Sequence, residues 1–252
     1  MKISVIVPSN KNKEINEFCK SYSKLTEFKK HAELIVIGNG EVKSAYCDKF
    51  IRYEKDFDII PFVELRGLGM LNSDSNFFLF LDDDHRFKNG ADRFLMECIS
   101  FLEEDNMCGV LQLDKKRSIK DWFEIKNDGY IWTSRGLFIK NTHMDIEHLF
   151  SLKGACEDLL YAYETLVYGW IPYKINQPFI IRDESKPNND KELNDKSYSK
   201  EVLDENIVGF INHHFSDPSW EFYGHLYNLR YPIDVRDVIL KTINKQMRKE
   251  FK

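Results

Sequence analysis

Three consecutive aspartates, Asp82, Asp83 and Asp84, are the side chains of this sequence whose types and spacing most clearly indicate chemistry. They directly follow the apolar run 77–81, which predicts a buried strand. Adjacent carboxylates repel one another, and a strand end does not need them for folding. Carboxylate oxygens suit Mg²⁺ and Mn²⁺, which also bind phosphate oxygens. The triplet therefore predicts a metal–phosphate site, against the alternatives of a solvated acidic turn or a helix N-cap.

A second acidic pair, Glu157 and Asp158, opens a predicted amphipathic helix over 157–168. Acidic residues at a helix N-terminus can simply stabilise the helix dipole. The alternative is a general base held at a substrate cleft. Because Gly154 and Gly169 bound this segment, we expect an exposed and rigidly placed pair, which favours the catalytic role.

The elements that must position these acids alternate between strands and helices. Predicted strands are 3–7, 33–37, 50–53, 76–81, 108–113, 130–132 and 136–139, and predicted helices include 13–30, 62–72 and 91–104. The first strand–helix–strand unit predicts a parallel sheet with a right-handed crossover. Ligands of open α/β sheets bind outside the carboxyl ends of the strands, where the aspartate triplet follows its strand.

Composition narrows the class of protein. The chain has 252 residues, of which 42% are apolar, so it can bury a substantial core. Its longest apolar run, 77–81, is far shorter than the ~20 residues of a membrane helix. The five cysteines are scattered, which predicts reduced thiols in a cytoplasmic protein. The N-terminus lacks the pattern of a signal peptide.

The formal charge of −5 comes from 41 acidic and 36 basic residues. Without the triplet and the Glu157–Asp158 pair, the remaining 36 acids would equal the bases in number. Net charge therefore does not exclude a polyanionic acceptor.

Four segments together resemble a GT-A glycosyltransferase, most closely the family-2-like enzymes. They are Ser-Val-Ile-Val-Pro-Ser-Asn (4–10), Glu-Leu-Ile-Val-Ile-Gly-Asn-Gly (33–40), Phe-Leu-Asp-Asp-Asp (80–84) and Glu-Asp (157–158). The resemblance covers about residues 1–175 and implies a Rossmann-like three-layer α/β/α sandwich with a mostly parallel central sheet. It implies one domain over 1–252, in which 1–113 bind the nucleotide-sugar, 114–234 bind the acceptor and 235–252 form a basic C-terminal helix.

The resemblance also implies roles for individual residues. The nucleotide candidates are Pro8, Ser9, Asn10 and Asn39. The family's Asp-x-Asp maps onto Asp82, which would reach the ribose and the metal, and Asp84, which would reach Mn²⁺ or Mg²⁺, while Asp83 shares either task. The family's catalytic base maps onto Asp158, with Glu157 before it.

Two departures from the family pattern concern recognition of the nucleotide base and binding of the metal. Gly38-Asn39-Gly40 stands where the family often has Asp-Asp-Gly-Ser. Residues 181–185 contain no histidine, although the family often has a metal-binding histidine in this region. His213 or His214 could supply that ligand, but paired histidines in a Phe-rich segment are more often structural.

The implied reaction moves a sugar from a nucleotide-sugar, first of all a UDP-sugar, to an acceptor hydroxyl in a single displacement with inversion. Asp158 would polarise the hydroxyl, and a metal held by Asp84 would neutralise the leaving diphosphate. Arg66 and Arg135 are candidate phosphate contacts, and a solvated arginine is the alternative for each. The polar segment 182–200 is expected to be a loop or lid that excludes water.

The acceptor stays open between a glycan, a polypeptide, a lipid headgroup and a nucleic acid. The triplet, followed by a polar residue and Arg86, also resembles phage enzymes that glycosylate hydroxymethylated DNA bases, and sugar mutases related to reversibly glycosylated proteins. Basic residues 115–117 and the basic tail favour DNA, with Trp122 and Trp132 as stacking groups. Such runs are more often solvated surface, and tryptophans are more often core.

Two other classes remain as alternatives. A nucleotidylyltransferase also joins an α/β sheet to a metal and a nucleotide, but its glycine-rich phosphate loop has no counterpart in residues 8–13, which lack glycine. A non-catalytic nucleotide-sugar-binding module would not need Asp82, Asp84 and Asp158 together.

Overall fold

The computed structural model describes residues 1–43, 45–55, 61–105, 108–115, 125–126, 136–141, 161 and 170–183. The helices are α1 (Asn12–Tyr22), α2 (Phe62–Leu71) and α3 (Ala91–Glu104), with a short 3₁₀ helix, η1 (Phe28–Lys30). The strands are β1 (Ile3–Ser9), β2 (Ala32–Gly38), β3 (Lys49–Arg52), β4 (Phe77–Phe80), β5 (His85–Phe87), β6 (Cys108–Lys115), β7 (Ile125–Lys126), β8 (Leu137–Lys140), β9 (Ile171–Gln177) and β10 (Ile180–Arg182).

The main sheet has eight strands in the order β3-β2-β1-β4-β8-β6-β9-β7. β3, β2, β1 and β4 run parallel, which confirms the predicted βαβ start. β8 runs antiparallel between β4 and β6, and β9 returns parallel to β6. β9 comes from the segment expected to bind the acceptor, so the sheet continues from one predicted half of the chain into the other.

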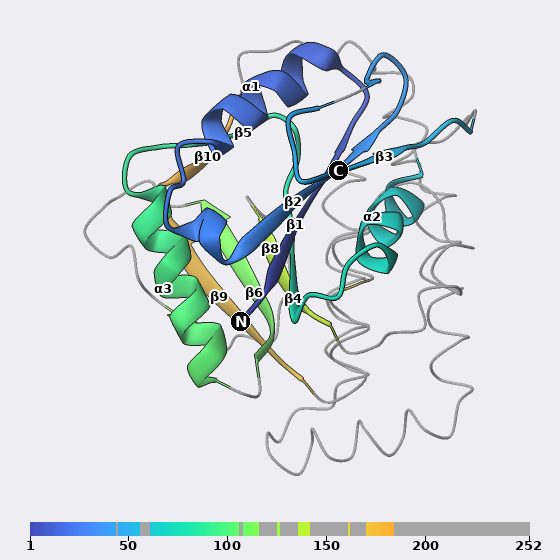
Figure 1. The fold of residues 1–252 in the computed structure, drawn as a ribbon. Coiled ribbons are helices and arrows are strands. Elements are labelled where there is room, and N and C mark those ends of the chain that lie inside the picture. Colours follow the sequence, from blue (N-terminus) through green and yellow to red (C-terminus); the bar gives the residue numbers. More distant parts are fainter. Residues whose placement is uncertain are drawn as a thin grey trace, which may run out of the picture.

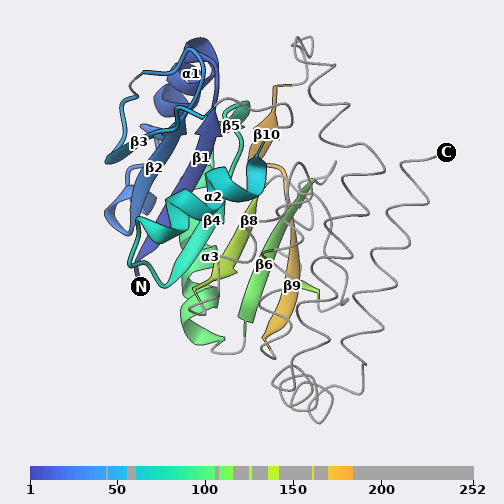
Figure 2. The same ribbon diagram turned by 90° about the vertical axis from the view of Figure 1, so that its right-hand side faces the viewer.

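Helices cover both faces of the sheet. Successive residues of a strand point to opposite faces, so the apolar residues of β1 pack against helices on both sides. Ile3, Val5 and Val7 of β1 are buried in one core cluster with residues of α1 and α3. Between them, Ile6 faces α2, where a side chain on Gly69 would come within 2.5 Å of Ile6 Cγ2. Figures 1 and 2 show α1 and α3 on one side of the sheet and α2 on the other. The predicted three-layer α/β/α arrangement is confirmed.

The first helix is shorter than predicted. The apolar spacing predicts a helix over 13–30, but α1 ends at Tyr22, and Phe28 belongs to η1. The backbone amides of Thr26, Glu27 and Phe28 donate instead to the carboxylate of Asp92, at 2.9–3.0 Å. A continuing helix would have used these amides internally, so a distant carboxylate ends it.

Several strands were not predicted, and several predictions lie outside the described residues. The short strands β5 and β10 form a separate two-stranded sheet, and β9 was also missed. The predicted strand 130–132, the helix 157–168 apart from Tyr161, the lid beyond Asp183 and the basic tail 235–252 fall outside the described residues.

Candidate active site

The carboxyl ends of β1, β2 and β4 bring the predicted nucleotide residues and the acidic triplet together. Parallel pairing places Ser9 beside Gly38, and Ile6 beside Phe80, so the three strands end at the same edge. The backbone amide of Asn39 donates to the Ser9 carbonyl at 2.9 Å. The Ser9 hydroxyl donates to Asp83 Oδ2 at 2.5 Å, which joins the end of β1 to the acids after β4.

Arg66 of α2 binds the carboxylate of Asp82. The guanidinium of Arg66 donates to Asp82 Oδ1 at 2.9 Å and lies over the Phe80 ring, 4.8 Å from its centre. The Arg66 side chain is only 3% exposed and is already paired with Asp82, so Arg66 is not a solvated arginine, and its contact with a phosphate stays a prediction. Burial alone would raise the pKa of Asp82, but His85, Arg66 and Arg182 outweigh burial and hold the pKa below its usual value.

Asp83 differs from its neighbour in its electrostatic surroundings. Burial raises the pKa of Asp83 to about 7, and the carboxylates of Asp82 and Asp84 add to this effect against the hydrogen bond from Ser9. Asp83 therefore titrates near neutral pH while Asp82 stays ionised.

Asp84 is paired with Arg182 of β10. Arg182 Nε donates to Asp84 Oδ2 at 2.5 Å, and the Arg182 NH2 group lies 3.6 Å from Asp82 Oδ2. The pairing is possible because β10 runs antiparallel to β5, with Arg182 opposite His85. Arg182 could not be singled out from the sequence, because only the pairing of β10 with β5 brings residue 182 to the triplet.

The chemistry of the acids fits a divalent cation. Asp82, Asp84 and His85 each offer a ligand atom, and these atoms lie within 4.8 Å of one another. Asp84 Oδ1 is buried and has no hydrogen-bond partner among the described residues, so a cation would satisfy a lone pair that these residues leave unused.

His85 is a site residue that sequence reasoning missed, although it adjoins the triplet. Its Nδ1 accepts a hydrogen bond from the Asp82 amide at 2.9 Å, so His85 fixes the turn that carries the acids. With Nδ1 accepting, a neutral ring carries its proton on Nε2, so in this state His85 stabilises the turn and does not ligate a cation.

Asn39 carries a second unsatisfied polar atom at the same edge. Its Nδ2 is buried and has no hydrogen-bond partner in the part of the chain that the structure describes. A buried donor without an acceptor costs free energy, and a nucleotide base or ribose could supply the acceptor. The remaining nucleotide candidates are close by, since the amide of Glu41 donates to the Asn10 carbonyl and Pro8 precedes Ser9 in β1.

The predicted catalytic pair Glu157 and Asp158, the phosphate candidate Arg135, and both His213 and His214 lie outside the described residues. Tyr161, three positions after Asp158 in the sequence, is described and fully buried. Its hydroxyl donates to the carbonyl of Val63 in α2 at 2.7 Å, and its ring packs edge-on against Phe80.

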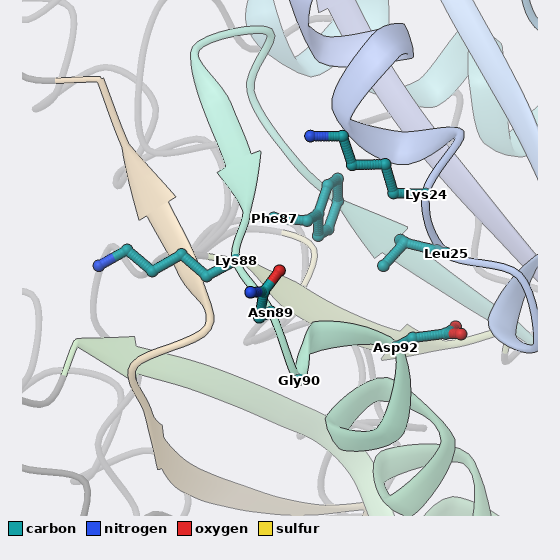
Figure 3. Close-up of a pocket in the computed structure, with 7 residues that line it drawn as sticks. All are labelled: Lys24, Leu25, Phe87, Lys88, Asn89, Gly90 and Asp92. Atoms are coloured by element: carbon teal, nitrogen blue, oxygen red, sulfur yellow. The ribbon is translucent and has the colours of Figure 1, made fainter.

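An open pocket of about 630 Å³ lies elsewhere, where the end of α1, the end of β5 and the start of α3 meet (Figure 3). Its lining residues are Lys24, Leu25, Phe87, Lys88, Asn89, Gly90 and Asp92. The ammonium groups of Lys24 and Lys88 do not converge, and Asp92 is occupied by the amides of 26–28. The pocket therefore lacks the converging charged groups that the acidic triplet provides.

Within the described part of the chain, no helix is long and apolar enough to cross a membrane.

Solved structures of two glycosyltransferases share this architecture. A structure of S. aureus TarS matches 92% of this chain and 44% of its own, with 16% identity and a TM-score of 0.56. A shorter form, TarS 1-349, matches 97% of this chain and 88% of its own, with 15% identity and a TM-score of 0.51. The mannosyltransferase PcManGT from Pyrobaculum calidifontis, in complex with GDP-Man and Mn²⁺, matches 97% of this chain and 73% of its own, with 13% identity and a TM-score of 0.57.

No protein-family model matches the sequence, and no curated protein matches it. At these identities the structural likeness establishes the fold alone. The chain has the GT-A fold, as predicted from its four motifs.

Proposed function

We propose that the chain is a metal-dependent glycosyltransferase that moves a sugar from a nucleotide-sugar to an acceptor hydroxyl, with inversion. The observation that carries the proposal is the convergence of Ser9, Asn39 and the acidic triplet at the carboxyl ends of three neighbouring strands of a GT-A fold. This edge is where open α/β sheets bind nucleotides.

The nucleotide would bind to Pro8, Ser9, Asn10 and Asn39. The unsatisfied Nδ2 of Asn39 supports this assignment, because it is a buried donor at the expected position of the base or ribose. A UDP-sugar is the first candidate donor. A GDP-sugar is the second, since PcManGT was solved with GDP-Man.

Asp84 and Asp82 would hold Mn²⁺ or Mg²⁺, with Asp82 also reaching the ribose and His214 as a further candidate ligand. When bound, the ion supplies charge neutralisation for the leaving diphosphate. Arg66 keeps the Asp82 carboxylate ionised and oriented. Asp83, tied to Ser9, links the nucleotide residues to the acids.

Asp158 would take the proton of the acceptor hydroxyl as its oxygen attacks the anomeric carbon from the face opposite the diphosphate. Glu157 precedes it, and Arg135 is a candidate phosphate contact. The packing of Tyr161 on Phe80 supports this assignment, because Phe80 ends the strand that leads to the triplet. The four cysteines in the described part of the chain are free thiols, which supports a reducing, cytoplasmic location.

The acceptor would be a glycan, a polypeptide or a hydroxymethylated base in DNA. The test incubates the full chain and Mn²⁺ with UDP- and GDP-sugars and each acceptor class, and measures nucleotide release and sugar transfer. Asp84→Ala should reduce turnover by a factor of about 100 or more. Asp158→Asn should remove transfer while nucleotide binding stays, and the exposed Asp74→Asn serves as the matched control.

Full activity of Asp84→Ala or Asp158→Asn would refute the role of that residue. Nucleotide-sugar binding without turnover would indicate a binding module, and pyrophosphate release from a nucleoside triphosphate would indicate a nucleotidylyltransferase. Transfer to DNA that falls steeply with salt would assign the acceptor to DNA.

A further inference from the structure

Arg182 already neutralises the carboxylates at which the cation is expected. Its Nε lies 2.5 Å from Asp84 Oδ2, and its NH2 group lies 3.6 Å from Asp82 Oδ2. One guanidinium therefore spans the two carboxylates of the candidate metal site. A cation bound to the same two oxygens would compete with this guanidinium for them.

The backbone of Arg182 is fixed, whereas its side chain has room to move. The pairing of β10 with β5 sets Arg182 opposite His85, and the amide of Asp183 donates to the Asp84 carbonyl at 3.0 Å. The Arg182 side chain is nevertheless 51% exposed, in contrast to the buried Arg66. Arg182, unlike Arg66, is therefore accessible to solvent and to a ligand.

Two guanidinium groups partly neutralise the carboxylates of the site. Asp82, Asp83 and Asp84 face Arg66 and Arg182, while Glu14 adds a further negative charge near Asp83. Among the described residues, no group donates a hydrogen bond to the buried Asp84 Oδ1, so Arg182 does not satisfy the whole carboxylate.

We propose that Arg182 is the resident counter-ion of Asp84 and Asp82, which a divalent cation must displace, and that the displaced guanidinium binds the donor diphosphate. The inference rests on the proposed function for the identity of the diphosphate. It assigns Arg182 a coupling role: the cation binds weakly alone and more tightly when a diphosphate takes over the guanidinium. Charge-assisted bidentate contacts of arginine with phosphate suit this exchange.

The test measures Mn²⁺ affinity of the full chain without nucleotide, by calorimetry or by the loss of the free Mn²⁺ paramagnetic signal. Arg182→Ala and Arg182→Gln should each bind Mn²⁺ about tenfold more tightly than the unaltered chain, since one charge-assisted contact no longer competes. Arg93→Ala, which removes an arginine that is 80% exposed and paired only locally with Glu97, should leave the affinity unchanged. UDP should raise Mn²⁺ affinity less in the Arg182 variants than in the unaltered chain.

Equal or weaker Mn²⁺ binding in both Arg182 variants, or no Mn²⁺ binding by any variant, would overturn the inference. The Gln variant retains side-chain length and polarity, and a thermal melt of each variant establishes that it is folded. Donor turnover with unchanged Mn²⁺ affinity in the Arg182 variants would overturn this inference alone. A tenfold gain in Mn²⁺ affinity in a chain that turns over no donor would instead overturn the proposed function.

Discussion

Arg66 donates to the carboxylate of Asp82 at 2.9 Å, and its guanidinium lies over the ring of Phe80. A second bond from Arg66 reaches the Leu81 carbonyl at 3.4 Å, so one side chain of α2 contacts three successive residues at the end of β4. The position of the first acid of the triplet is thus set by the packing of a helix on the sheet.

Replacing Arg66 with methionine should therefore affect both stability and the site. The substitution leaves the Asp82 carboxylate without its buried partner, and we expect a loss of about 2 kcal/mol in the free energy of unfolding, reduced from that of a fully buried pair because Asp82 is partly exposed. Denaturant unfolding measures the loss. In an Arg66→Met/Asp82→Asn double variant the two losses should not add, and strict additivity would show that the pair is not coupled.

Asn39→Ala should weaken nucleotide binding with little effect on stability. Within the described part of the chain Nδ2 of Asn39 has no partner, and Oδ1 accepts from the amide of the exposed Gly40, where water can replace the lost bond. We expect about tenfold weaker binding of the preferred nucleoside diphosphate, measured by calorimetry, with an unchanged melting temperature. A fall in melting temperature with unchanged affinity would instead make Asn39 a structural residue.

Asp92→Ala should destabilise the fold in a pH-dependent way. Burial alone would raise the pKa of Asp92, but hydrogen bonds from the amides of Glu27 and Phe28 and from Thr26 hold the pKa below its usual value. Stabilisation by this carboxylate is therefore fully present above the unfolded pKa of about 3.9 and is lost as pH falls through the lower folded pKa. We expect a loss of about 1–2 kcal/mol at pH 7 in denaturant unfolding.

The difference between Asp92→Ala and the unaltered chain should shrink below about pH 4. Asp74→Ala, at an exposed position, provides the control and should change stability little at either pH. A difference for Asp92→Ala that is constant from pH 7 to pH 3 would contradict the electrostatic origin of the effect.

Gly69→Ala should destabilise the protein although alanine favours helices. A Cβ at position 69 would lie 2.5 Å from Ile6 Cγ2, so α2 would have to move away from β1. Overpacking outweighs the gain in helix propensity, and we expect a net loss of about 1–2 kcal/mol by thermal or denaturant unfolding. Combining it with Ile6→Ala, which removes the obstructing methyl group, should cost less than the sum of the two single changes.

The sequence sufficed for the order and type of the main elements, because buried strands and amphipathic helices have clear local periodicity. Strand geometry placed the triplet at the carboxyl end of its strand, whereas Ser9 and Asn39 were predicted only through the resemblance to GT-A enzymes, and the parallel pairing brings all of them to one edge. The end of α1 could not be predicted, because the carboxylate that captures the following amides comes from Asp92, more than sixty residues later.

The arginines that pair with the acidic triplet could not be predicted from local sequence patterns either. β5 and β10 are too short for an alternating hydrophobic pattern to identify them as strands. Arg66 was singled out only for its charge, because its burial depends on how α2 packs against Phe80. A single sequence does not show the role of a charged residue when that role depends on pairing between distant parts of the fold.

The β5–β10 pairing joins two parts of the chain that the ribosome synthesises at different times. Arg182 lies 98 residues after Asp84. At the usual rate of translation the ribosome needs roughly 5 to 20 s to synthesise that interval. During synthesis Asp84 therefore leaves the ribosome before the arginine that pairs with it, whereas Arg66, the partner of Asp82, has already been synthesised.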